Sequence, residues 1–235
     1  MHSFHLVRTN PLTTVRALLR PPTPATVGGL VHAECLTGMR LGAPVVSPAR
    51  MQLSRLAMFA SWRDGAALDE FLACDPLGRH LAGGWHVRLE FLRRWGSVSE
   101  LGLPERADRS FPDEPVVAVT LARMRLPELP RFISWGRPVE RLVRDHPGAT
   151  LAMAAIRPPR TVSTFSVWRS TREMVEMVHG HTDMDQPRRH IDAMAERERR
   201  DFHHEFTTLR FRPLSEHGSW QGQAGFVPSD DGRVT

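Results

Sequence analysis

The sequence predicts an α+β protein made of two tandem ferredoxin-like units. In the second half of the chain, apolar periodicity gives the order strand, helix, strand, strand, helix, strand, which is typical of a four-stranded antiparallel sheet with two helices on one face. The pattern Phe-x-x-Trp-Arg begins at Phe59 and again at Phe165, and a helix-capping residue, Asp64 or Ser170, follows each copy. This ordered repeat favours a duplicated unit.

The first unit is predicted to span residues 1–96 and to be the degenerate copy. Alternating apolar residues before Arg20 indicate a strand, and the first helix is reduced to residues 12–19. The helix that Asp64 caps runs to about Leu72. Three further strands are expected at residues 31–41, 56–62 and 85–95.

Residues 97–115 collect glycine, serine, proline and acidic residues without a period, which predicts a linker. The second unit then covers residues 116–222, and residues 223–235 are expected to form a disordered tail. Ser170 and Glu173 form a capping box at the start of its second helix. Strands are expected at 116–124, 150–156, 161–168 and 203–214, and helices after Pro127, after Ser170 and at 187–200.

A ferredoxin-like unit has one apolar sheet face that its own helices do not cover, and this face must be buried. We therefore expect the sheets of the two units to pack face to face. They would enclose a pocket near Trp168, at the end of the second Trp-ended strand.

Composition excludes several classes of protein. The net charge is +5, but all 31 basic residues are arginine and 26 acidic residues are interspersed among them. The densest cluster, residues 188–200, mixes both signs at helical spacing, as on a solvated helix face, so no nucleic-acid partner is expected. Cys35 and Cys74 have no partner motif and predict neither a disulfide framework nor a thiolate metal site.

The chain has no apolar run near the roughly 18 residues that a membrane span needs. The N-terminal residues also lack the apolar core of a signal peptide. We expect a cytoplasmic protein with no integral membrane segment, present as a monomer, which is then a pseudo-dimer, or as a homodimer. Glycine-rich loops with the spacing of a flavin or NAD site are absent.

Several blocks of the sequence resemble the spheroidene monooxygenase family. They are VVAVTLARMRLPELPRFISW, GATLAMAAIRPPRTVSTFSVWRS, HIDAMAERERRDFHHEF and GSWQG in the second half, and LTGMRLGAPVVSPARMQLSRLAMFASWRD in the first. The resemblance covers roughly residues 30–225. It implies a dimeric α+β barrel fold, oxygen-dependent hydroxylation or ketolation of an apolar polyene, and an association with heme.

The same resemblance implies the site residues. The histidine of the helix after the Trp-ended strand falls on His190, and Trp168 matches the strand-end tryptophan. We expect His190 to reach the barrel interior as the axial ligand of a heme iron, with Trp168 and Arg169 beside the substrate. Arg160, Arg169 or Arg189 would then bind the heme carboxylates. The alternative is that His190 makes only a capping or polar contact.

The expected function is that of a monooxygenase acting on an apolar small molecule, such as a polyene or an isoprenoid, in a barrel cavity with the help of heme. Two alternatives stay open. One is a cofactor-independent oxygenase of the same fold, in which cavity Trp and His side chains activate an electron-rich substrate toward oxygen. The other is a non-catalytic module that binds a hydrophobic ligand, because such folds serve many purposes.

Overall fold

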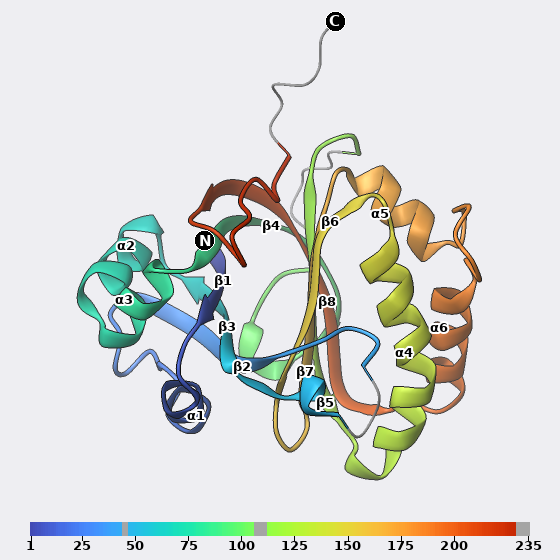
Figure 1. The fold of residues 1–235 in the computed structure, drawn as a ribbon, viewed down its shortest axis with the longest axis horizontal. Coiled ribbons are helices and arrows are strands. Elements are labelled where there is room, and N and C mark those ends of the chain that lie inside the picture. The colour runs from blue at the N-terminus through green and yellow to red at the C-terminus, as the bar shows by residue number, and fades with distance from the viewer. Residues whose placement is uncertain (44–46, 106–111, 229–235) are drawn as a thin grey trace, which may run out of the picture.

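The computed structural model describes residues 1–43, 47–105 and 112–228. Within these residues, eight strands close into one barrel in the order β1-β3-β2-β6-β7-β5-β8-β4. Helices α1, α2 and α3 lie on one side of the barrel and α4, α5 and α6 on the other (Figure 1). Each unit thus covers the outer face of its own sheet, and the predicted fold class of two tandem ferredoxin-like units in an intrachain α+β barrel is confirmed.

Helices α1 and α2 of the first unit begin at capping residues, whose side chains accept hydrogen bonds from amides that have no carbonyl partner within the helix. Asn10 accepts a hydrogen bond from the Thr13 amide at the start of α1, and Asp64 accepts one from the Ala67 amide at the start of α2. Helix α3 was not expected, although Asp75 followed by Pro76 is a typical start signal. The elements are β1 (His2–Arg8), α1 (Pro11–Leu19), β2 (Leu30–Met39), β3 (Gln52–Trp62), α2 (Gly65–Cys74), α3 (Pro76–Ala82) and β4 (Trp85–Ser97).

The second unit follows the predicted order more closely. The Ser170 side chain accepts a hydrogen bond from the Glu173 amide, which caps α5 as the sequence predicts. The elements are β5 (Val116–Met124), α4 (Leu129–Asp145), β6 (Ala149–Arg157), β7 (Thr161–Trp168), α5 (Thr171–Val178), α6 (Arg189–Arg199) and β8 (His203–His217). No helix in the described part of the chain is both long enough and apolar enough to cross a membrane.

The two sheets join edge to edge as well as facing each other across the barrel. Strands β4 and β8 pair over a long register, from His86 opposite His217 to Ser97 opposite Phe206. Strands β2 and β6 pair only from Thr37 opposite Ile156 to Met39 opposite Ala154. One junction between the units is therefore closed along its length, and the other is short.

The repeated Phe-x-x-Trp pattern has a structural explanation. Phe59 and Phe165 lie inside the barrel, whereas Trp62 and Trp168 lie on the outer face beneath the helices of their own units. Residues three apart on a strand point to opposite faces, so one pattern supplies both cores. Phe165 stacks on Phe4 of the first unit with ring centroids 3.7 Å apart, so the middle of the barrel is filled by aromatic side chains.

The predicted linker and tail both take part in the fold. Val98 and Leu101, which follow β4 directly, pack into the barrel core. The tail that the sequence predicts to be disordered from residue 223 is held as far as residue 228, because Glu216 accepts hydrogen bonds from the amides of Gly225, Phe226 and Val227. Residues 106–111 of the linker and 229–235 of the tail lie outside the described residues.

Candidate functional site

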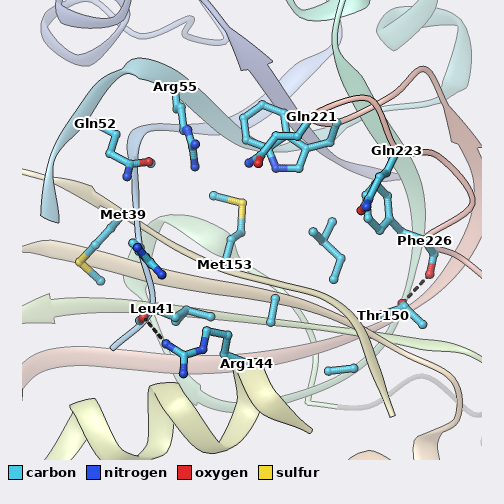
Figure 2. Close-up of a pocket in the computed structure, with 16 residues that line it drawn as sticks. Met39, Leu41, Gln52, Arg55, Arg144, Thr150, Met153, Gln221, Gln223 and Phe226 are labelled. Atoms are coloured by element: carbon cyan, nitrogen blue, oxygen red, sulfur yellow. Dashed lines mark hydrogen bonds between the residues drawn. The ribbon is translucent and has the colours of Figure 1, made fainter. Parts of the chain in front are cut away.

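A cavity of about 300 Å³ lies at the short junction between the two units, at the end of the barrel where β2 finishes and β6 begins (Figure 2). We call it the seam cavity. Its volume is at the lower end of the range for ligand sites and equals that of about ten liquid waters. The lining residues are Gly38, Met39, Arg40, Leu41, Gln52, Arg55, Arg144, Ala149, Thr150, Leu151, Ala152, Met153, Trp220, Gln221, Gln223 and Phe226.

The short pairing of β2 with β6 creates this cavity. Strand β6 starts at Ala149, but its pairing with β2 begins only at Ala154. In the described part of the chain, residues 149–153 therefore have no strand partner on the side of the first unit, although β7 pairs with their other side. The units separate here, and side chains from both of them line the opening.

A bulge in β3 turns two polar side chains into the seam cavity. Thr37 pairs with Leu56, but its neighbour Gly38 pairs with Gln52, so residues 53–55 are additional on the β3 side. Bulges of this kind redirect side chains and occur often beside functional sites. Gln52 and Arg55 both line the cavity as a result. A Cβ atom at Gly38 would lie 3.0 Å from the Arg55 Cβ, so the glycine leaves room for the arginine stem.

The seam cavity is electrostatically positive. No aspartate, glutamate or histidine is among the described residues that line it, whereas Arg40, Arg55 and Arg144 are. Arg144 is neutralised by Asp145, since its Nη2 lies 2.6 Å from the Asp145 Oδ2. The Arg55 guanidinium lies 5.7 Å from the centre of the Trp220 ring and has no acidic partner among the described residues. The Gln52 Oε1 atom is buried in the cavity wall without a hydrogen-bond partner.

Residues 220–227, which we call the closing segment, form one wall of the cavity. Glu216 holds this segment: its Oε1 accepts hydrogen bonds from the Gly225 and Phe226 amides at 2.9 and 3.0 Å, and its Oε2 accepts one from the Val227 amide at 2.7 Å. The same carboxylate accepts a hydrogen bond from the Trp85 indole at 2.7 Å. The Thr150 hydroxyl donates to the Phe226 carbonyl oxygen, which ties the segment to β6 (Figure 2).

Replacing Glu216 by alanine is expected to release the closing segment. The variant loses hydrogen bonds from three amides and one indole to a charged acceptor, and we expect the free energy of unfolding to fall by about 2 kcal/mol. Hydrogen exchange should show faster exchange at the amides of residues 225–227. Glu198→Ala, on the exposed face of α6, is the matched control. Unchanged protection of these amides in the Glu216 variant would show that other contacts hold the segment.

The residues expected to form a heme site do not all lie together. Trp168 is 1% exposed on the outer face of β7, where it packs with Met174 and Met177 rather than facing the barrel interior. Arg160 precedes β7 and Arg169 follows it. The two arginines are therefore separated by the length of this eight-residue strand, which is roughly 25 Å. Arg160 and Arg169 therefore cannot bind the same heme at its carboxylates.

His190 lies in the first turn of α6, a helix that packs against α4 and α5, so it does not reach the barrel interior as expected. Burial lowers the pKa of His190 below its ordinary value, and a hydrogen bond with the Val178 backbone opposes this shift. A neutral imidazole with one ring nitrogen already engaged leaves the other nitrogen free to bind a metal. Of the expected residues, His190 thus has the chemistry of an axial ligand.

A second cavity of about 390 Å³ lies between α4 and the connection from α5 to α6. It is lined by Pro138, Arg141, Leu142, Asp145, Met184, Asp185, Gln186 and Arg189. Arg189 is among these lining residues, but its neighbour His190 is not, so of these two only Arg189 reaches the cavity. Trp168, Arg160 and Arg169 line neither cavity and do not fit a heme site in either.

Sequence reasoning did not identify the residues of the seam cavity. One signal was present: Gly38 interrupts an apolar strand, and a glycine there indicates a bulge or a close backbone approach. Arg55 and Gln52 carry no motif of their own. Glu216 and the closing segment could not have been assigned, because their role depends on contacts between residues far apart in the chain.

Comparisons with known proteins support the architecture. No family model and no curated protein matches the sequence. Among solved structures, an aldoxime dehydratase in complex with butyraldoxime is 8% identical, with 91% of this chain and 79% of that chain covered and a TM-score of 0.51. A monooxygenase-like protein from Listeria innocua is 12% identical over 92% of this chain and 96% of that one, with a TM-score of 0.29.

A heme-degrading enzyme from Listeria monocytogenes is 13% identical, with 89% of this chain and 99% of that chain covered and a TM-score of 0.28. At 8% identity, the likeness to the aldoxime dehydratase speaks to fold and not to activity. The similarity to the aldoxime dehydratase shows that this barrel of two ferredoxin-like units is an architecture also found in a solved enzyme.

Proposed function

We propose that this protein is an oxygenase that binds a small, largely apolar organic molecule in the seam cavity. The observation that carries the proposal is the cavity itself, which residues of both units line and which combines Met153, Leu151 and Phe226 with arginine and amide side chains. Methionine adapts its shape to an apolar guest. The oxygen-dependent activity rests on the resemblance of the sequence blocks to the spheroidene monooxygenase family.

The size of the seam cavity favours a compact substrate. A volume of about 300 Å³ corresponds to about ten waters, which supports a short isoprenoid or a small aromatic molecule rather than an enclosed long polyene. Because no histidine or carboxylate is among the described lining residues, none of these side chains can act as a general base near neutral pH. The substrate would be oriented by apolar contacts and by hydrogen bonds from Gln52 and Arg55.

Oxygen uptake with filled and unfilled cavities tests this proposal. Protein supplied with 1-naphthol or geraniol, with and without added hemin, is expected to consume oxygen above the rate in buffer. Met153→Trp fills the cavity and should abolish this uptake, whereas Met51→Trp, at an exposed position, should leave it unchanged. Equal uptake by both variants would place the activity elsewhere, and uptake by chelator-treated protein without hemin would favour the cofactor-independent alternative.

A heme bound beside α6 is a second component of the proposal, and it rests on the resemblance of the sequence blocks to the spheroidene monooxygenase family. Burial lowers the pKa of His190, which keeps its imidazole neutral, as a metal ligand must be. His190 would bind the heme iron and Arg189 would bind a heme carboxylate, and the heme would supply oxygen activation. Hemin titration should give a Soret band that is lost in His190→Ala and kept in His181→Ala, an exposed histidine on the preceding connection. An identical band in both variants would exclude His190 as the ligand.

A non-catalytic binding module is the second candidate function. The absence of any histidine or carboxylate from the described lining of the seam cavity favours it, because such a wall can bind a ligand without moving protons. Ligand binding without oxygen uptake in either hemin-free or hemin-supplemented protein would support this candidate over the oxygenase.

A further inference from the structure

We propose that the ligand of the seam cavity is an organic carboxylate with an apolar body, and that Arg55 binds its carboxylate group. This inference rests on the proposed function, because it concerns the same cavity. It names a class of molecule that neither the sequence blocks nor the structural similarities indicate.

The first argument is the uncompensated charge. Arg55 projects into the cavity from the bulge in β3, and no acidic side chain among residues 1–43, 47–105 and 112–228 pairs with it. A half-buried cation gives up part of its hydration and is stabilised when an anion replaces it. Arg144 at the other side of the cavity differs, because it is paired with Asp145 and donates a hydrogen bond to the Leu41 carbonyl oxygen.

The second argument is the set of amides around this charge. Figure 2 shows the Arg55 guanidinium pointing into the cavity, with the side-chain amides of Gln52 and Gln221 on either side of it in this view. The Gln52 Oε1 atom has no hydrogen-bond partner, so rotating the amide by 180° breaks no hydrogen bond of that oxygen and puts the NH2 donor in its place. A planar guanidinium binds a carboxylate through two parallel hydrogen bonds, and a neighbouring amide can donate a further one.

The third argument is the apolar remainder of the cavity. Met153, Leu151 and Phe226 line the same cavity as Arg55, and the closing segment forms one wall of it. A free inorganic anion would leave these apolar groups without a partner. A neutral hydrocarbon would leave the guanidinium without one. An amphipathic carboxylate satisfies both sides of the cavity.

The absence of a general base agrees with this assignment. With no histidine or carboxylate among its described lining residues, the cavity has no group to remove a proton from a neutral acid. A carboxylic acid is already ionised at neutral pH and needs no such group. A carboxylate ligand is therefore compatible with a wall whose described residues include no proton acceptor.

Calorimetric titration of the full chain with octanoate and with 1-octanol tests the inference. Both probes have the same apolar tail, and they differ in the charged group. We expect octanoate to bind at least about tenfold more tightly than 1-octanol. Arg55→Met should remove this preference, and Arg55→Lys should keep part of it because the charge stays and the planar fork is lost. Arg16→Gln, on the exposed face of α1, is the control and should behave like the unaltered protein.

The outcomes separate this inference from the proposed function. Equal binding of octanoate and 1-octanol, unaltered in Arg55→Met, would overturn the carboxylate assignment and leave the cavity as a site for neutral molecules. A preference for octanoate that persists in both Arg55 variants, with folding verified by circular dichroism, would also overturn it. If neither probe binds and Met153→Trp leaves oxygen uptake unchanged, the assignment and the proposed function fail together.

Discussion

Replacement of Glu34 by alanine is expected to lower the free energy of unfolding by about 3–5 kcal/mol, because it leaves two arginines near the barrel interior without their shared partner. Glu34 is 1% exposed and lies on β2 of the first unit. Its carboxylate is hydrogen-bonded by Arg123, on β5, and its Oε2 lies 2.8 Å from the Arg157 Nη2, at the end of β6. The cluster thus joins the two units at the barrel end opposite the seam cavity.

The pKa of Glu34 supports the charged state of this cluster. Burial alone would raise the pKa of the carboxyl, but hydrogen bonds from His32 and Arg123, together with the charges of Arg123 and Arg157, hold it below its ordinary value. The Glu34 carboxylate is therefore ionised at neutral pH. Removing one partner of these buried ion pairs costs more stability than removing one partner of a surface pair, because it leaves an unpaired charge in the interior.

Urea denaturation of Glu34→Ala and Glu34→Gln measures this effect. The glutamine keeps the shape and one acceptor oxygen but loses the charge, so we expect a destabilisation of about 2–4 kcal/mol. Glu70→Ala, on the exposed face of α2, is the control and should change stability by less than about 0.5 kcal/mol. A loss below about 1 kcal/mol in Glu34→Ala would mean that water or a rearranged Glu100 replaces the carboxylate.

Acidification from pH 7 to pH 5 is expected to remove several kcal/mol of stability through three buried histidines. Burial, with the nearby N-terminal amine, lowers the pKa of His2 to about 4, and burial, with His217 and Arg88, lowers the pKa of His86 to about 4. Burial, followed by His86 and Arg88, lowers the pKa of His5 well below its ordinary value. All three imidazoles are therefore neutral in the folded protein at neutral pH.

The sign of the pH dependence follows from these shifts. Between pH 6.5 and about 4 the unfolded chain binds protons at His2 and His86 and the folded chain does not, so stability is full above pH 6.5 and falls as pH decreases toward 4. Below pH 6.5, each of these two histidines lowers the free energy of unfolding by about 1.4 kcal/mol per pH unit, which amounts to about 2 kcal/mol at pH 5. The lowered pKa of His5 contributes a loss of the same sign.

Unfolding free energies measured in urea at pH 7, 6 and 5 test this dependence. His2→Phe replaces an imidazole that lies among Phe59, Phe91 and Phe211 in the barrel core. The variant should take up about one proton fewer on unfolding, which lowers the slope of the unfolding free energy against pH. His204→Gln, at an exposed position on β8, should leave the slope unchanged. A slope that is the same in His2→Phe and in the unaltered protein would show that His2 is protonated without cost in the fold.

The fold could be predicted from the sequence where local signals agree with tertiary packing. Strand β5 and helix α5 lie where the apolar residues and the capping box place them, because β5 is apolar on both faces and buries both, and α5 buries its apolar stripe. Helix α3 was missed although Asp75 and Pro76 indicate its start, because it is short and has a weak apolar stripe. The outward direction of Trp168 follows from strand alternation once Phe165 is known to face the core.

The candidate site could not be predicted in the same way. The seam cavity depends on how β2 aligns with β6, and no local pattern sets the register between strands of different units. Arg55 enters the cavity only because a bulge in β3 turns it inward. His190 was expected inside the barrel, but α6 packs on α4 and α5, since its short apolar stripe is buried by those helices.

The unequal lengths of the two junctions have a consequence for how such a molecule can evolve. In a symmetric pair of identical subunits, the twofold axis makes both junctions copies of each other, so any change that opens one opens both. A single polypeptide has no such constraint. Here the long pairing of β4 with β8 holds the two units together. Mutations near Gly38 and Ala154 can therefore widen or narrow the seam cavity without weakening the β4–β8 junction.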